Sequence, residues 1–270
     1  MKRFPVALQL YSVRDDLDKD YEATLRKVKA MGYDGVELPG LSDKVTPAEI
    51  KKMCKEIGLV PISSHVPLLD MIANPDIINS FKEIGCEYVV IPYLNEDLRP
   101  GTDGFAKVID AAKMLSEKAN ELGMKICYHN HDFEFTKIGD EYAIDILYNE
   151  VPYLQPEFDT CWVKVAGEDP SAYIRKYAGR QDLLHLKDYV GEQCENMYNL
   201  IGLDDDEEKI ASGNFEFRPV GYGCQDFYSI LNAAEDARVE WIIIEQDQPS
   251  IGKTPLECAE LGVKYINTIN

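Results

Sequence analysis

Short apolar runs alternate with longer amphipathic segments along the whole chain. Eight of these runs are rich in Ile, Leu, Val or aromatic residues and predict buried strands, at 6–11, 35–38, 60–64, 88–92, 125–129, 155–159, 183–187 and 241–245. Most are spaced as one strand and one helix require, and eight such units close a parallel barrel. The sequence therefore predicts one α/β domain over residues 1–270, folded as a (β/α)8 barrel.

The segments between the predicted strands carry helix-start signals. Thr46 with Glu49 and Thr254 with Glu257 each form a capping-box pattern, and a proline occupies the first helical position of both. A doubly wound open sheet is the rival architecture. It needs a glycine-rich loop after the first strand, and residues 9–13 contain no glycine. The pattern therefore favours the barrel.

Residues 191–213 interrupt this alternation with a weakly periodic, acidic stretch that includes five consecutive acidic residues at 204–208. It follows the seventh predicted strand, so it is expected to be a loop insertion near the barrel mouth. Two interpretations stay open, a lid over the mouth and a solvated excursion.

Composition limits the partners. The net charge of −20 would repel phosphodiester backbones and argues against a nucleic-acid ligand. Seven cysteines are scattered without a CxxC pair, which argues against a disulfide framework. No signal-peptide pattern opens the chain, and no apolar stretch reaches the ~18 residues of a membrane span. We expect a cytoplasmic protein without a membrane partner; the oligomeric state stays open, a homo-oligomer included.

Four predicted strands end in side chains that bind metals. The candidates are His129, His131, Glu134, Asp159, His185 and Glu245. Parallel strands deliver such side chains to one edge of the barrel, where barrel active sites lie. A mixture of carboxylates and imidazoles suits one divalent cation such as Mn²⁺, Mg²⁺, Co²⁺ or Zn²⁺.

Each candidate also has an ordinary structural interpretation. Asp159 could cap a helix, and His185 could be a satisfied core histidine. Glu245 ends the most apolar strand, where a carboxylate is costly unless it binds a metal or pairs with Lys187. We expect Asp159, His185 and Glu245 to be metal ligands. Lys187 could hold a substrate oxygen or pair with a site carboxylate.

The fifth predicted strand leaves one choice open. We expect Glu134 to be its metal ligand and His131 to act as an acid or base, because histidine titrates near neutral pH. The main competitor for the ligand position is His129, which ends the strand. His129 is otherwise expected to contact the substrate.

Four further residues are expected to line a substrate cavity, His65, Glu37, Tyr11 and Trp162. His65 and Glu37 each lie at the end of a predicted strand. Tyr11 and Trp162 would give apolar walls that suit the C–H faces of a sugar. No cluster of arginines at the strand ends favours a phosphorylated substrate.

The ordered motifs LQLYSVRDDL, GYDGVEL, YHNHDFEF, EFDTCWV, HLKD, RPVGYG and IIEQD cover nearly the whole chain. Together they resemble the sugar phosphate isomerase/epimerase family of xylose isomerase-like TIM barrels. The resemblance implies one divalent metal at the strand ends and matches Asp159, His185 and Glu245. Family epimerases carry a glutamate at the end of the fifth strand, where this chain has His129. In this respect the chain looks more like the inosose dehydratase and keto-sugar lyase branches.

The sequence thus predicts a metal-dependent isomerase or epimerase that acts on a sugar, keto-sugar or cyclitol. Glu245 would remove a proton next to a carbonyl, with His131 as partner and a metal-stabilised enediolate as intermediate. Dehydration or keto-glycoside C–O lysis through the same first step is the close alternative. A non-catalytic sugar-binding subunit is a remote alternative. An abasic-site endonuclease would need more histidines than four and a basic surface.

Overall fold

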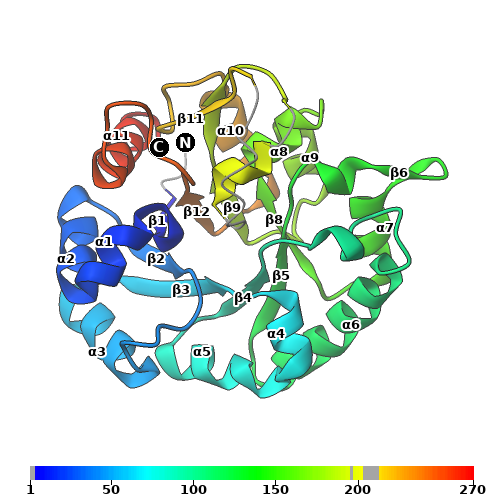
Figure 1. Cartoon of the computed structure of the whole chain (residues 1–270), viewed down its shortest axis with the longest axis horizontal. Coiled ribbons are helices and arrows are strands. Elements are labelled where there is room, and N and C mark those ends of the chain that lie inside the picture. The colour runs from blue at the N-terminus through cyan, green and yellow to red at the C-terminus, as the bar shows by residue number, and fades with distance from the viewer. Residues whose placement is uncertain (1–3, 195–196, 203–212) are drawn as a thin grey trace.

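The computed structural model describes residues 4–194, 197–202 and 213–270, and it confirms the predicted barrel. Eight parallel strands close on themselves in the order β1-β12-β9-β8-β5-β4-β3-β2 (Figure 1). Their bounds are β1 Val6–Gln9, β2 Gly35–Leu38, β3 Val60–His65, β4 Tyr88–Ile91, β5 Lys125–His129, β8 Gln155–Asp159, β9 Leu183–Leu186 and β12 Trp241–Ile244. All eight strand runs of the sequence therefore form the barrel wall.

The α-helices surround this wall as an outer ring (Figure 1). They are α1 Arg14–Lys19, α2 Tyr21–Met31, α3 Pro47–Ile57, α4 Leu68–Ala73, α5 Ile78–Ile84, α6 Phe105–Glu121, α7 Ala143–Glu150, α8 Thr160–Val165, α9 Pro170–Lys176, α10 Phe227–Ala237 and α11 Pro255–Ile269. Short 3-10 helices lie at η1 Leu10–Val13, η2 Pro75–Ile77, η3 Glu96–Leu98 and η4 Phe133–Phe135. Across the ranges that the structure describes, no helix combines the length and apolar character needed to cross a membrane.

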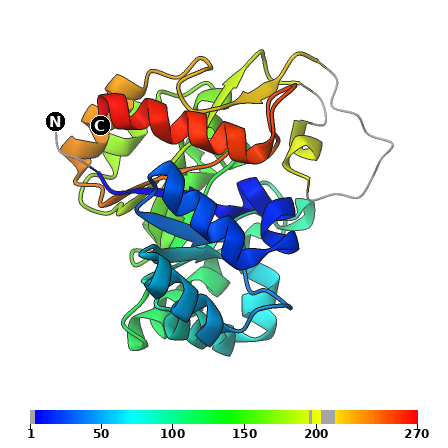
Figure 2. The same cartoon turned by 90° about the vertical axis from the view of Figure 1, so that its left-hand side faces the viewer.

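Both predicted capping boxes are present. The Thr46 hydroxyl accepts from the Glu49 amide, and the Glu49 carboxylate accepts from the Thr46 amide at 2.9 Å. The same exchange between Thr254 and Glu257 begins α11, which packs beside α2 (Figure 2). Such caps satisfy amides that have no partner inside the helix.

The barrel interior is layered. An apolar layer contains Ala7, Ile62, Tyr88, Val90, Cys127, Leu183 and Ile243. Successive residues of a strand point to opposite faces, so the residues two positions later point inward one layer higher. Cys127 is thus followed by His129, Leu183 by His185, and Ile243 by Glu245. The polar layer stands directly on the apolar one.

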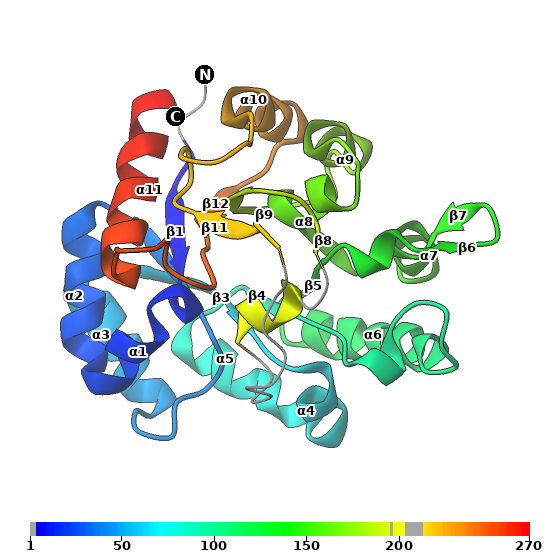
Figure 3. The ribbon, with the colours of Figure 1, turned by 45° about the horizontal axis from the view of Figure 1, so that its top comes forward.

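The connection after β9 lies over one end of the barrel. Strand β10 (Asp188–Val190) pairs antiparallel with β11 (Glu216–Arg218), and η5 (Met197–Ile201) lies over the opening (Figure 3). The Tyr11 hydroxyl donates to the Ile201 carbonyl at 3.0 Å and ties η5 to the first strand's end. The acidic run at 204–208, and with it the lid hypothesis, lies outside the described residues. A further hairpin, β6 (Lys137–Ile138) with β7 (Glu141–Tyr142), stands away from the mouth.

Candidate active site

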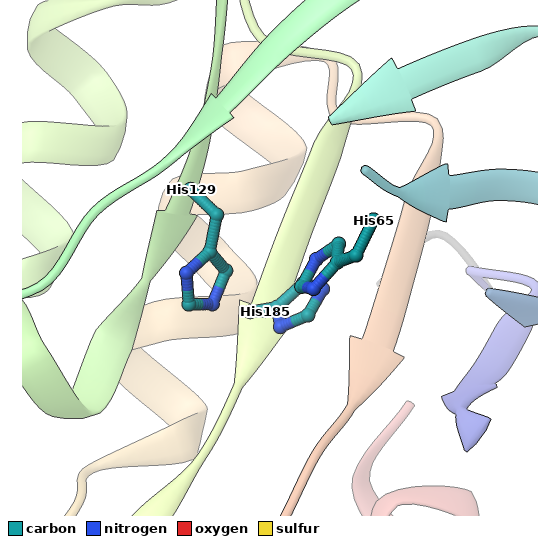
Figure 4. A group of neighbouring side chains, drawn as sticks. All are labelled: His65, His129 and His185. Atoms are coloured by element: carbon teal, nitrogen blue, oxygen red, sulfur yellow. The ribbon is translucent and has the colours of Figure 1, made fainter. Parts of the chain in front are cut away.

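Four side chains at the carboxyl ends of neighbouring strands converge inside the barrel. His129, Asp159, His185 and Glu245 each offer a ligand atom, and these atoms lie within 4.8 Å of one another. All four residues are buried. Figure 4 shows the rings of His129 and His185 turned toward each other and toward His65. Three of the four ligands expected from the sequence are in this group, and the fourth place belongs to His129.

The unsatisfied atoms of this group fit a divalent cation. Asp159 Oδ1 accepts from the amides of Cys161 and Trp162 and caps α8, whereas Asp159 Oδ2 has no hydrogen bond. Both nitrogens of His129 also lack a well-formed hydrogen bond, although its Nε2 lies 3.3 Å from Asp159 Oδ2 as an ion pair. Buried polar atoms are costly when unpaired, and mixed oxygen and nitrogen donors suit Zn²⁺, Mn²⁺ or Co²⁺. Asp159 therefore fulfils both interpretations, helix cap and candidate ligand.

Lys187 is the cation at the centre of this group. Its Nζ lies 2.7 Å from Glu245 Oε2, 2.9 Å from Asp247 Oδ2 and 3.3 Å from Asp159 Oδ2. Burial opposes ionisation of Glu245 and Asp159, but the charge of Lys187 lowers the pKa of both carboxyls. Sequence reasoning missed Asp247. Alternation could have indicated it, because Asp247 lies two residues after Glu245, just as Lys187 lies two residues after His185.

The imidazoles beside these carboxylates hold a proton tightly. Burial alone would lower their pKa values. The carboxylates of Asp159 and Glu245 instead raise the pKa of His129 to about 9, and those of Glu157 and Glu37 raise that of His185 to about 10. In the metal-free protein both rings are therefore charged at neutral pH.

A second group lies on the other side of His185. His185 Nδ1 is 3.2 Å from Glu245 Oε2, and its Nε2 is 2.7 Å from Glu37 Oε2. His65 Nε2 lies 3.1 Å from Glu37 Oε2 and 3.2 Å from Glu157 Oε2. Sequence reasoning missed Glu157, which alternation on β8 places on the same face as Asp159.

Glu134 does not lie with the ligand group. It belongs to η4, beyond the end of β5, and is fully buried. Its Oε1 accepts from the Tyr128 hydroxyl at 2.5 Å and its Oε2 from the His131 amide at 2.8 Å. Burial raises the pKa of Glu134 to about 7. In this structure the carboxylate holds the chain that carries His131.

His131 lies beside the ligand group as an uncharged ring. Its centroid is 5.3 Å from that of His129 and 5.1 Å from that of Trp162. Burial, followed by the charges of His129 and Lys187, lowers the pKa of His131 well below its usual value. Its Nδ1 is buried and has no hydrogen-bond partner. The uncharged ring can therefore accept a hydrogen bond.

A cavity of about 310 Å³ opens above these residues. It is lined by Tyr11, Pro39, His65, Pro67, Pro92, Tyr93, Asn95, His129, His131, Lys187, Ile201, Glu245 and Asp247. Prolines and tyrosines form apolar walls, while imidazoles and carboxylates form the floor. Among the described residues, Lys187 is the one lysine or arginine in the lining. Of the expected substrate contacts, Tyr11, His65 and His129 reach the cavity; Trp162 and Glu37 are buried behind it.

The sequence profile of the xylose isomerase-like TIM barrel family matches residues 25–268. The chain belongs to this family. The match covers seven of the eight barrel strands and every residue of the two groups described above, and the resemblance seen in the sequence motifs is thereby confirmed.

Named relatives within this family include inosose dehydratases. That of Clostridium beijerinckii is 31% identical over 163 residues, which cover 58% of this chain and 52% of the relative. The chain thus matches about half the length of this curated relative. A sugar phosphate isomerase/epimerase from Parabacteroides distasonis superposes with a TM-score of 0.76 at 22% identity and covers 98% of both chains. An L-ribulose 3-epimerase superposes with a TM-score of 0.71 at 14% identity, covering 98% of this chain and 94% of its own. At these identities the two solved structures support the fold alone.

Proposed function

We propose that the protein is a divalent-metal-dependent isomerase or epimerase of a sugar, keto-sugar or cyclitol. The proposed reaction removes a proton next to a carbonyl and passes through an enediolate. The observation that carries the proposal is the convergence of His129, Asp159, His185 and Glu245 under an open cavity. When bound there, a divalent cation would polarise the substrate carbonyl and stabilise the negative charge that develops on its oxygen.

The chain's own residues supply the proton transfers. Glu245 is ionised because Lys187 is next to it, and it lines the cavity, so its carboxylate can accept the α-proton. Lys187 donates from the same place and can hold a substrate oxygen or the developing oxyanion. His131 Nδ1 faces no protein partner and is the proposed second acid or base.

The apolar walls fit an uncharged substrate ring. Three prolines and two tyrosines can cover the C–H faces of a sugar or cyclitol, while the floor meets its hydroxyls. Lys187 is already surrounded by three carboxylates, so it offers little attraction for a phosphate. The proposal is therefore a substrate without a phosphate group.

Dehydration or keto-glycoside C–O lysis is the alternative, and two observations favour it. His129 occupies the strand end where an epimerase would need a second glutamate, and a named relative is an inosose dehydratase. The uncharged His131 suits this reaction because one ring could take the α-proton and return it to the leaving oxygen. The C–H and C–O bonds then break on one side of the substrate, and water or an alcohol leaves. A non-catalytic sugar-binding subunit would need neither step.

Deuterium exchange tests the proposal. Purified protein loaded with Mn²⁺ is incubated in D₂O with ketoses, keto-glycosides and inososes, and products are analysed by mass spectrometry. Metal-dependent deuterium incorporation beside the carbonyl, lost in Glu245→Gln, is expected. An epimerised or isomerised product supports the first reaction, and loss of water or an alcohol supports the alternative. Bound metal without exchange across the panel would refute both and favour a binding role.

A further inference from the structure

We infer that the barrel holds a second divalent cation, bound by Glu37, His65 and Glu157. Their ligand atoms, with one nitrogen of His185, lie within 4.8 Å of one another. Like the first ligand group, the set mixes imidazole with carboxylate. The three side chains come from β2, β3 and β8, so rigid strands hold them in place.

The charges of this second group support a cation there. Glu37 and Glu157 are both 0% exposed, and among the described residues their ion-pair partners are His65 and His185. His185 faces the first group through Nδ1 and the second through Nε2. Two buried carboxylates placed this close together are unfavourable without compensating positive charge.

One oxygen in the group is unpaired as a ligand atom would be. Glu157 Oε1 is buried and has no hydrogen-bond partner, although Glu157 Oε2 lies against His65. No other donor in the described part of the chain satisfies it.

Hydrogen bonds from residues outside the group hold the Glu37 carboxylate in place. Its Oε1 accepts from the Ser63 hydroxyl at 2.6 Å, and its Oε2 accepts from the Gln9 side-chain amide at 2.7 Å. Ligand carboxylates are commonly fixed by such hydrogen bonds from residues that do not touch the metal. His65 lines the cavity, so a cation can reach this group from solvent by the same route as the first.

Counting bound Mn²⁺ tests this inference without any substrate. Equilibrium dialysis followed by elemental analysis gives the number of ions per chain. We expect two for the wild type, one for Glu157→Gln, one for Asp159→Asn and two for the control Glu240→Gln. The Glu240→Gln control also removes one carboxylate, but Glu240 is exposed and precedes β12, at the end of the strand away from Glu245. Circular dichroism verifies the fold, and His65→Gln replaces Glu157→Gln if that variant does not fold.

Electron paramagnetic resonance gives a second readout. Two Mn²⁺ ions separated by the single ring of His185 couple, so the wild-type signal should be broadened and both single-site variants should show isolated Mn²⁺. One ion per chain in both the wild type and Glu157→Gln would overturn the inference. The outcome is separable from the proposed function, because an inactive protein with two coupled ions supports the inference and contradicts only the proposed reaction.

Discussion

Removing Lys187 should destabilise the metal-free protein far more than removing a surface lysine. The Lys187 side chain is 2% exposed and contacts the carboxylates of Asp159, Glu245 and Asp247. Lys187→Met keeps the length of the side chain but leaves these carboxylates without their cation. Breaking a buried ion pair from one side costs about 3–5 kcal/mol in the free energy of unfolding.

Thermal unfolding of metal-free protein measures this cost. For a chain of this size each kcal/mol lowers Tm by about 2 °C, so a loss of roughly 6–10 °C is expected. Lys125→Met is the matched control: Lys125 pairs with Asp182, but 49% of the lysine side chain is exposed. Such a surface pair contributes less than about 1 kcal/mol.

Divalent metal should raise the Tm of Lys187→Met more than that of Lys125→Met, because the added cation binds two of the carboxylates that lost Lys187. Equal Tm values for the two metal-free variants would refute the reasoning. Such a result would mean that the three carboxylates are not held together by the charge of Lys187.

Three further results are expected. Equilibrium dialysis should show at least ~10-fold weaker metal affinity for His129→Gln than for the wild type. The affinity of Glu134→Gln should be unchanged, because the Glu134 carboxylate is hydrogen-bonded to Tyr128 and His131, away from the ligand group. The reverse order would make Glu134 the ligand. Metal affinity measured by calorimetry should rise from pH 6 to pH 9, and binding should release protons. The pKa values of His129 and His185 are raised to about 9 and 10, so a cation must displace those protons. An affinity that does not change with pH would contradict this. Tyr11→Phe removes the hydrogen bond to the Ile201 carbonyl, worth about 1 kcal/mol, so hydrogen exchange in η5 should quicken about 5-fold; unchanged exchange would show that other contacts hold η5.

The strands and their inward faces were predictable because both follow from local periodicity. Alternation within one strand sets the direction of His185, Lys187 and Glu245 before any contact is known. The first strand shows a limit: it ends at Gln9, two residues earlier than expected, because Gln9 caps η1 by accepting from the Tyr11 amide. This hydrogen bond decides whether the chain continues as a strand or turns into a 3-10 helix, and the apolar pattern does not record it.

The choice between Glu134 and His129 could not be read from the sequence. Glu134 lies in η4, beyond the strand, where alternation no longer fixes the direction of a side chain. Its contact with Tyr128 depends on the turn of that helix. Contacts between strands, such as Lys187 with Asp247, depend on the register in which the barrel closes, and no single strand contains that information.

All four histidines of the chain lie in one cluster, and each ring centroid is within 5.4 Å of another. The protein therefore carries a built-in, site-specific label. Histidine ring signals from uniformly ¹⁵N-labelled protein, or modification by an imidazole-selective reagent, would report on the barrel floor and nothing else. This advantage disappears if the protein is purified through a polyhistidine tag, which adds competing rings and cation-binding sites, so a tag of another chemistry is the right choice for metal studies.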